Sequence, residues 1–278
     1  MKARLGLVRL VWAMVMINLA PFSAHADGDL TQDAAAHLRE AELACLRDAD
    51  VREGVIKIGN ALCIFSISTP IDAFTDDLFE GVDVVVLHST GGHVASFVTL
   101  GKRLVKTNAQ FVVPQRCESS CAMVLLPVLQ NLVVRDGAIV ALHTPLIYDV
   151  HQYAELLTAR GTKARAFARV PGLTEDQWLS QVSEGMARNI FLREEWKGFL
   201  TANAVSPELF DLYKTPSSCA ASLPPAEQGD YLTVVNKAFY ANFTATTNWV
   251  WERTVSPNDV EMLFGADAAK YYCFSFVQ

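Results

Sequence analysis

The chain has 278 residues, of which 51% are hydrophobic and 19% charged, with a formal net charge of −7. This length and apolar content suit one large domain, or one domain with an added segment, that buries a substantial core. An acidic chain without a basic stripe excludes nucleic acid and anionic membrane surfaces as expected partners.

The first 26 residues have the features of a secretory signal peptide. Lys2, Arg4 and Arg9 surround the apolar run "LVRLVWAMVMINLAPF", and an A-x-A cleavage pattern ends at Ala26. The alternative is a membrane anchor, but the apolar stretch is short for a spanning helix and carries Arg9. We therefore expect a mature protein in the periplasm or secreted, with no stable membrane span and a net charge of about −10.

An even number of cysteines in an exported chain implies disulfide bonds. The sequence does not fix their connectivity, and a zinc site is a rival interpretation. No C-x2-C pair or H-x3-5-H partner supports zinc, so we expect no metal. Sequence order suggests the pairs Cys45–Cys63, Cys117–Cys121 and Cys219–Cys273.

The mature chain begins with helical periodicity over residues 31–50. Residues 54–67 alternate and are rich in β-branched side chains, which predicts one strand or a hairpin through a Gly-Asn turn. A short amphipathic helix is expected at 70–80. The continuous apolar run at 82–89, "VDVVVLHS", predicts a strand buried on both faces.

The next segments alternate between strands and helices. "TGGHVASFVTLGKRLVKT" turns through Gly91-Gly92 into a helix, "AQFVVP" is a second strand, and "QRCESSCAMVLLP" begins a second helix. "NLVVRDGAIVALH" adds two short strands, so the order predicts βαβ units in a parallel sheet. Because sites in such sheets lie at the carboxyl ends of strands, Gly91-Gly92 and the Cys117–Cys121 segment should face a common cleft.

The rest of the chain is expected to be mostly helical, then rich in Pro, Ser and Gly, and finally aromatic. The predicted class is α/β. The predicted organisation is a signal peptide at 1–26, an α/β domain at 27–213, and a linker with a small aromatic-rich C-terminal appendage at 214–278, tied back by Cys219–Cys273.

The glycine turn in "LHSTGGHVASF" is the first candidate for chemistry. Glycines permit positive φ and let the backbone approach a ligand closely. Amides next to a helix N-terminus are suited to a developing negative charge. The alternative is a plain tight turn between strand and helix.

The serine pair in "RCESSCAMVLL" is the second candidate. A nucleophilic serine needs a sharp turn that opens a helix, with an amide beside it. A Cys117–Cys121 bridge would hold such a turn rigid around Ser119 and Ser120. The alternative is that one of the serines only caps the helix.

His143 ends the apolar strand "AIVALH" and is the candidate general base. His88 and His93 flank the glycine turn and compete for this role, and His151 lies just downstream. A lone histidine at a strand end is more often a structural hydrogen-bonding group. The three motifs are therefore informative only in combination.

Their order, S-T-G-G, then a C-x-S-x-C serine, then a strand-end histidine, resembles the Clp/crotonase superfamily. It looks most like the predicted periplasmic Clp-type serine peptidase-like proteins, in which S-P-G-G precedes a cysteine-flanked serine. The resemblance covers about residues 54–150 and implies a crotonase/ClpP-like fold of stacked βαβ units with a helical second half. It implies Ser119 as nucleophile, His143 as base, and an oxyanion hole made by Gly91, Gly92 and the Ser120 amide.

Two departures from the family pattern bear on the chemistry. Thr90 stands where the family usually has proline. Family spacing puts the acidic third member near residues 190–195, but Glu194 and Glu195 there lie in a helix-like "FLREEWKGF", so neither is assigned. A Ser-His dyad would still work, less efficiently if nothing holds the imidazole tautomer.

These residues lead to hypotheses from different classes. The first is an exported serine hydrolase, specifically a peptidase acting on a peptide or protein substrate without a cofactor. The second is a catalytically inactive ClpP-like binding or scaffolding protein of the cell envelope, motivated by the missing acid, Thr90 and the aromatic tail. A third, a crotonase-type acyl-CoA enzyme, is disfavoured by export and by the lack of a basic patch. The resemblance also implies a homo-oligomer through the helical stretch 174–213.

Overall fold

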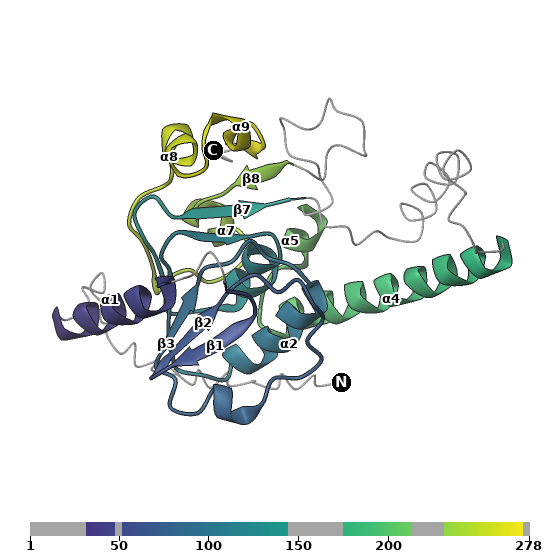
Figure 1. Cartoon of the computed structure of the whole chain (residues 1–278), viewed down its shortest axis with the longest axis horizontal. Helices are drawn as coiled ribbons and strands as arrows, with labels where there is room; N and C mark the ends of the chain where they lie inside the picture. The colour runs from purple at the N-terminus through teal and green to yellow at the C-terminus, as the bar shows by residue number, and fades with distance from the viewer. Residues whose placement is uncertain (1–31, 48–51, 144–174, 213–230, 275–278) are drawn as a thin grey trace, which may run out of the picture.

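The computed structural model of the chain describes residues 32–47, 52–143, 175–212 and 231–274. Within these ranges the protein is α/β, with two mixed, mostly parallel sheets and a C-terminal aromatic cluster (Figure 1). The predicted signal peptide, the linker, His151 and Cys219 lie outside these ranges. No helix in the described part of the chain is long and apolar enough to cross a membrane.

The first sheet has six strands in the order β1-β2-β3-β4-β6-β9. β1 and β2 form the antiparallel hairpin that the Gly-Asn turn predicts, and every other neighbouring pair is parallel. All residues of β2 and β3 are buried, which explains their continuous apolar sequences. The strands are β1 (Val55–Ile58), β2 (Ala61–Ile64), β3 (Val84–Leu87), β4 (Gln110–Val113), β6 (Leu132–Val134) and β9 (Trp249–Trp251).

The second sheet has the order β10-β8-β7-β5. An isolated parallel bridge between Ser89 and Cys117 joins the chain after β3 to β5, so the two sheets meet beside the glycine turn. The two short strands predicted around the Asp-Gly turn exist as β6 and β7 but belong to different sheets. The strands are β5 (Arg116–Glu118), β7 (Ile139–Leu142), β8 (Leu232–Val234) and β10 (Tyr272–Cys273).

The helices surround the two sheets: α1 packs on the first, α8 packs on the second, and α4 extends beyond both (Figure 1). The end of the long helix α4 packs on α2, where Phe199 lies against Gly101. The helices are α1 (Gln32–Leu46), α2 (Val94–Leu104), α4 (Glu175–Ala202), α5 (Pro207–Leu212), α7 (Lys237–Ala241), α8 (Pro257–Phe264) and α9 (Ala266–Ala269).

The prediction of an amphipathic helix at 70–80 is wrong, because only the short 3-10 turn η2 (Asp76–Leu78) forms there. The Lys57 ammonium donates to the backbone carbonyls of Asp77, at 3.0 Å, and Glu80, at 2.5 Å. Carbonyls that bind this side chain satisfy their hydrogen-bonding need without a longer helix.

The C-terminal aromatic segment differs from the expected appendage, because it contributes strands to both sheets. Trp249 in β9 and Tyr240 in α7 belong to the main core. The Tyr240 hydroxyl donates to the Ala122 carbonyl, and the Trp249 indole donates to the Leu129 carbonyl, each at 2.9 Å. These bonds connect the tail directly to the segment that follows Ser119.

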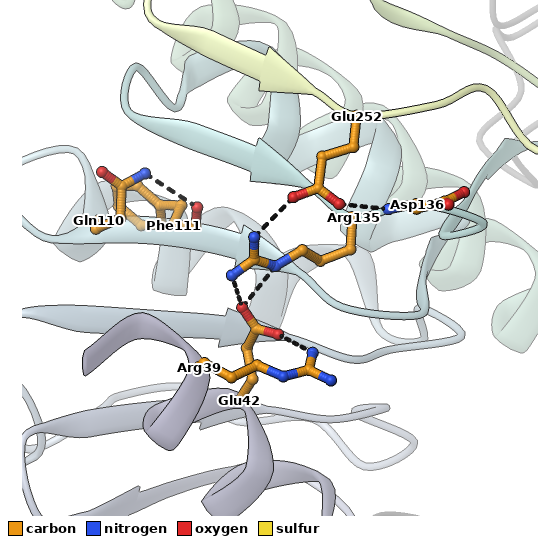
Figure 2. A network of polar contacts seen from close by, with 7 residues as sticks. All are labelled: Arg39, Glu42, Gln110, Phe111, Arg135, Asp136 and Glu252. Carbon is orange, nitrogen blue, oxygen red and sulfur yellow. Dashed lines mark hydrogen bonds and ion pairs between the residues drawn. The ribbon is translucent and has the colours of Figure 1, made fainter. Parts of the chain in front are cut away.

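A charged network joins the N-terminal helix to the tail (Figure 2). The Glu42 carboxylate on α1 is fully buried. Arg135, just after β6, donates to Glu42 from Nε at 2.7 Å and also from Nη2, and to Glu252 Oε1 from Nη1 at 2.7 Å. Glu252, just after β9, accepts from the Asp136 N–H at 2.8 Å. One arginine therefore links α1, β6 and β9.

Replacing Arg135 by Met should lower the free energy of unfolding by about 3–5 kcal/mol, because the buried Glu42 carboxylate loses its main partner. The double variant Glu42→Gln/Arg135→Met should recover part of this loss, because no charge then stays buried. Denaturant unfolding followed by circular dichroism measures both.

Lys102→Ala is the control, because the Lys102–Glu195 pair, 2.6 Å apart, is partly exposed. It should cost less than about 1 kcal/mol. A loss in Arg135→Met no larger than that of the control would contradict a stabilising role for the network.

Candidate active site

Ser119 lies in a strained turn directly after β5. Its φ is 52°, a left-handed conformation that is uncommon outside glycine. The Ser119 N–H donates to the Ala141 carbonyl at 2.9 Å, and its carbonyl accepts from the Met123 N–H at 2.8 Å. The turn is therefore fixed by β7 on one side and by the following helical segment on the other, as a nucleophile at a strand-to-helix turn requires.

His143 lies beside Ser119 because the strands that precede them are parallel neighbours. Glu118 of β5 pairs with Ala141 of β7 in the register of the second sheet. The two chains therefore leave the sheet at the same edge. Ser119 Oγ and His143 Nε2 are 2.6 Å apart, a distance at which the imidazole can take the hydroxyl proton.

The competing histidines near the glycine turn lie in other surroundings. His93 is the N-cap residue of α2, and its Nδ1 lies 3.4 Å from Ser96 Oγ. His88 has an edge-on ring contact with Phe65 at 6.5 Å. Among the described histidines, His143 is thus the one that lies at hydrogen-bond distance from Ser119.

The segment after Ser119 is less regular than the predicted helix. It forms the π-helical turn η3 (Cys121–Leu125) followed by the 3-10 turn η4 (Leu126–Val128). Pro127 lacks an N–H group and therefore cannot extend a regular α-helix here. Single π-turns are frequent at functional sites.

A disulfide bond between Cys117 and Cys121 spans the turn that holds Ser119. Cys117 is in β5, Cys121 begins η3, and both side chains are fully buried. The predicted Cys45–Cys63 pair is also present and links α1 to β2. The third predicted pair includes Cys219, which is outside the described ranges, and stays a prediction.

Gly91 lies directly against Ser119. A Cβ atom on Gly91 would be 2.5 Å from Ser119 Cβ and 2.9 Å from Ser119 Oγ, and φ at Gly91 is 94°. Only glycine allows this approach. The Gly91 N–H already donates to Ser89 Oγ at 3.0 Å.

Gly92 offers the open amide of the turn. The Gly91 carbonyl accepts from the Ile67 N–H at 3.0 Å. In a trans peptide the C=O and N–H point in opposite directions, so the Gly92 N–H points away from Ile67. Gly92 is exposed, and its N–H has no partner among the hydrogen bonds of the described residues. Ser120, buried beside it, opens the first turn of η3, where amides lack helical partners.

The acidic residues near position 190 give no third member of a triad. Glu195 pairs with Lys102, and Glu194 is exposed. Sequence reasoning missed a buried carboxylate at Glu118, which accepts from Arg116 Nη2 at 2.8 Å and from the Tyr272 hydroxyl at 3.1 Å. Burial and the Glu118 charge raise the pKa of Tyr272. The i, i+2 spacing of Arg116 and Glu118 on a strand was the available signal.

Comparisons with protein-family models, with curated proteins and with solved structures each found no match. The chemistry is therefore argued from the geometry. A serine hydroxyl 2.6 Å from an imidazole, beside an open backbone amide, has the parts that acyl transfer needs. In the described part of the chain no group of acidic, histidine or cysteine side chains is arranged to hold a metal ion.

Gly91→Ala should lower the free energy of unfolding by several kcal/mol, because the new methyl group overlaps Ser119 and the Glu118 carbonyl. Gly54→Ala is the matched control, since Gly54 has φ of 82° but open space around it. The control should lose only about 1–2 kcal/mol from backbone strain. Equal losses in denaturant unfolding would contradict the close approach.

Removal of the two disulfides should affect stability differently. Cys45→Ala/Cys63→Ala should cost about 3 kcal/mol and Cys117→Ala/Cys121→Ala about 2 kcal/mol, because the sequence separations are 18 and 4. Denaturant unfolding measures both. A larger loss for Cys117→Ala/Cys121→Ala than for Cys45→Ala/Cys63→Ala would show that the short bridge stabilises more of the protein than its own turn.

Proposed function

We propose that this protein is an exported serine hydrolase, specifically a peptidase, on a crotonase/ClpP-like fold. The observation that carries the proposal is the 2.6 Å distance between Ser119 Oγ and His143 Nε2. The strained φ of Ser119 and the close approach of Gly91 support it. The parallel strands joined through helix α2 support the finer fold assignment.

The reaction begins when His143 Nε2 accepts the Ser119 proton and Oγ attacks the carbonyl carbon of the substrate. The negative charge that develops on the carbonyl oxygen is bound by the N–H groups of Gly92 and Ser120. Gly91 serves the site differently from the sequence expectation, because its own N–H is occupied by Ser89. Because Gly91 has no side chain, the glycine turn can lie directly against Ser119.

The tetrahedral intermediate collapses when His143 gives its proton to the leaving amine and the carbon–nitrogen bond breaks. Water then enters and loses a proton to His143, and its oxygen attacks the acyl-enzyme ester. Breakdown of the second intermediate releases the acid and returns the proton to Ser119 Oγ. No cofactor takes part in these steps.

The substrate, location and assembly belong to the same proposal and rest on the family resemblance and the predicted leader. The substrate is a peptide or protein, and the leader at 1–26 directs the chain to the periplasm or outside. Helix α4 extends beyond the sheets and exposes Phe191, of which 71% is accessible (Figure 1). The homo-oligomer through this helix is carried by the family resemblance, since a single exposed apolar side chain is normal on a protein surface.

The alternative, a catalytically inactive binding or scaffolding protein, loses one of its motives. Thr90, in place of the family's proline, is held by Ser66, with the two hydroxyl oxygens 2.5 Å apart and the Thr90 N–H donating to Ser66 Oγ at 3.1 Å. Of the tail aromatics, Trp249 is buried and Tyr272 half-buried, while Tyr271 is 39% exposed. The turn is therefore held without proline, whereas the tail aromatics are only partly buried and still motivate the alternative.

Labelling of the mature, oxidised protein with a fluorophosphonate probe tests the proposal. The wild type should be labelled and Ser119→Ala should not. His143→Ala should react at least about a hundredfold more slowly, because the base is lost. Ser120→Ala should still be labelled, which separates the two serines.

Circular dichroism and thermal unfolding of each variant provide the folding control. A folded wild type that remains unlabelled would contradict the hydrolase and favour the inactive ClpP-like binding protein. Labelling that persists in Ser119→Ala would show that another residue is the nucleophile.

A further inference from the structure

The hydroxyl of Ser120 connects the two halves of the proposed oxyanion hole. Ser120 Oγ donates to the Gly92 carbonyl at 2.7 Å, across 28 positions of sequence. Ser120 is 1% exposed, so water does not replace this bond easily. Its neighbour Ser119 faces His143 instead. The two serines of "CESSC" therefore use their hydroxyls for different contacts.

This bond completes the support of the glycine turn. On one side, Ile67 binds both peptide groups of Gly92, because its N–H donates to the Gly91 carbonyl and its carbonyl accepts from the His93 N–H at 2.7 Å. On the opposite side, the Gly92 carbonyl accepts from Ser120 and the Gly92 N–H is open. Among the described residues, the Ser120 side chain thus holds Gly92 from the side of the site.

The bond also has an electrostatic consequence. A carbonyl oxygen carries partial negative charge, and the Gly92 carbonyl faces the same side as the Gly92 N–H that would bind the oxyanion. Without a donor, this carbonyl would repel the charge that develops on the substrate oxygen. A hydroxyl directed at it removes much of that repulsion and keeps the amide aimed at the site.

We infer that Ser120 is a positioning residue, whose side chain holds Gly92 so that the amides of Gly92 and Ser120 bind the oxyanion together. The inference rests on the proposed function and adds a role for the Ser120 side chain. The hydroxyl acts through Gly92 and exchanges no proton with the substrate. It therefore affects the rate of the acylation step and leaves the nucleophile and base in place.

The test is the second-order rate constant for fluorophosphonate labelling of the full mature protein. Ser120→Ala should react on the order of tenfold more slowly than the wild type, because the amide is less well placed. Ser120→Thr keeps a hydroxyl donor and should restore most of the rate. Its added methyl group lies in a buried site, so its stability should fall even as its rate recovers.

Ser96→Ala is the matched control. Ser96 is also 1% exposed, and its hydroxyl accepts from the Ile71 N–H at 2.8 Å, on α2 near the same glycine turn. This variant should lose stability like Ser120→Ala but label within about twofold of the wild type, because its bond does not involve Gly92. Thermal unfolding of all variants accompanies the rates.

The outcomes separate the two claims. If the wild type is labelled and Ser120→Ala reacts as fast as Ser96→Ala, the positioning role is overturned and the hydrolase stands. If Ser120→Thr is as slow as Ser120→Ala, a hydroxyl at this position is not what matters, and the inference is again overturned. If the folded wild type is unlabelled, the proposed function fails and the inference fails with it.

Discussion

The parallel pairing of β5 with β7 is the constraint on which the candidate site depends. β5 has only three residues, yet it pairs with β7 and reaches Ser89 through a bridge on its other side. This places the end of β5 between the glycine turn and His143. Because strand ends in a parallel sheet emerge at one edge, Ser119, His143 and the open amide of Gly92 meet there.

The left-handed turn at Ser119 needs support from several directions, since its conformation is unfavourable by itself. β7 binds its N–H, the first helical turn binds its carbonyl, and the Cys117–Cys121 bridge closes around it. Gly91 leaves the space that the turn occupies. Each contact is modest, but together they leave the serine hydroxyl few orientations, which is the condition for a preorganised site.

The sequence was sufficient for the parts of the fold that are marked by continuous apolar runs and glycine turns. β2, β3, β4 and the β1–β2 hairpin lie where these patterns predict them, and Ser119 and His143 meet as their positions after strands suggest. Two predicted cysteine pairs are present. The strands and the hairpin are local features, so short stretches of sequence determine them.

The features that the sequence did not reveal depend on contacts between distant segments. β5 is too short to show a strand pattern, and its existence follows from its neighbours on both sides. Glu118 is buried because Arg116 and Tyr272 surround it, and the local i, i+2 spacing with Arg116 gives no sign of the distant Tyr272. Likewise, β9 joins the first sheet only through its pairing with β6, so the aromatic tail could not be recognised as part of the core.

The placement of β9 at the edge of the first sheet has a consequence for biogenesis. Arg135 and Glu252 are 117 positions apart, and Glu118 and Tyr272 are 154 apart, so both sheets close only after nearly the whole chain has been synthesised. Contacts of such high sequence separation form slowly. A chain with this topology therefore completes its two sheets late in folding. Under the proposal that the chain is exported, late closure keeps it in a state that can be threaded through a translocation pore before Ser119 and His143 meet.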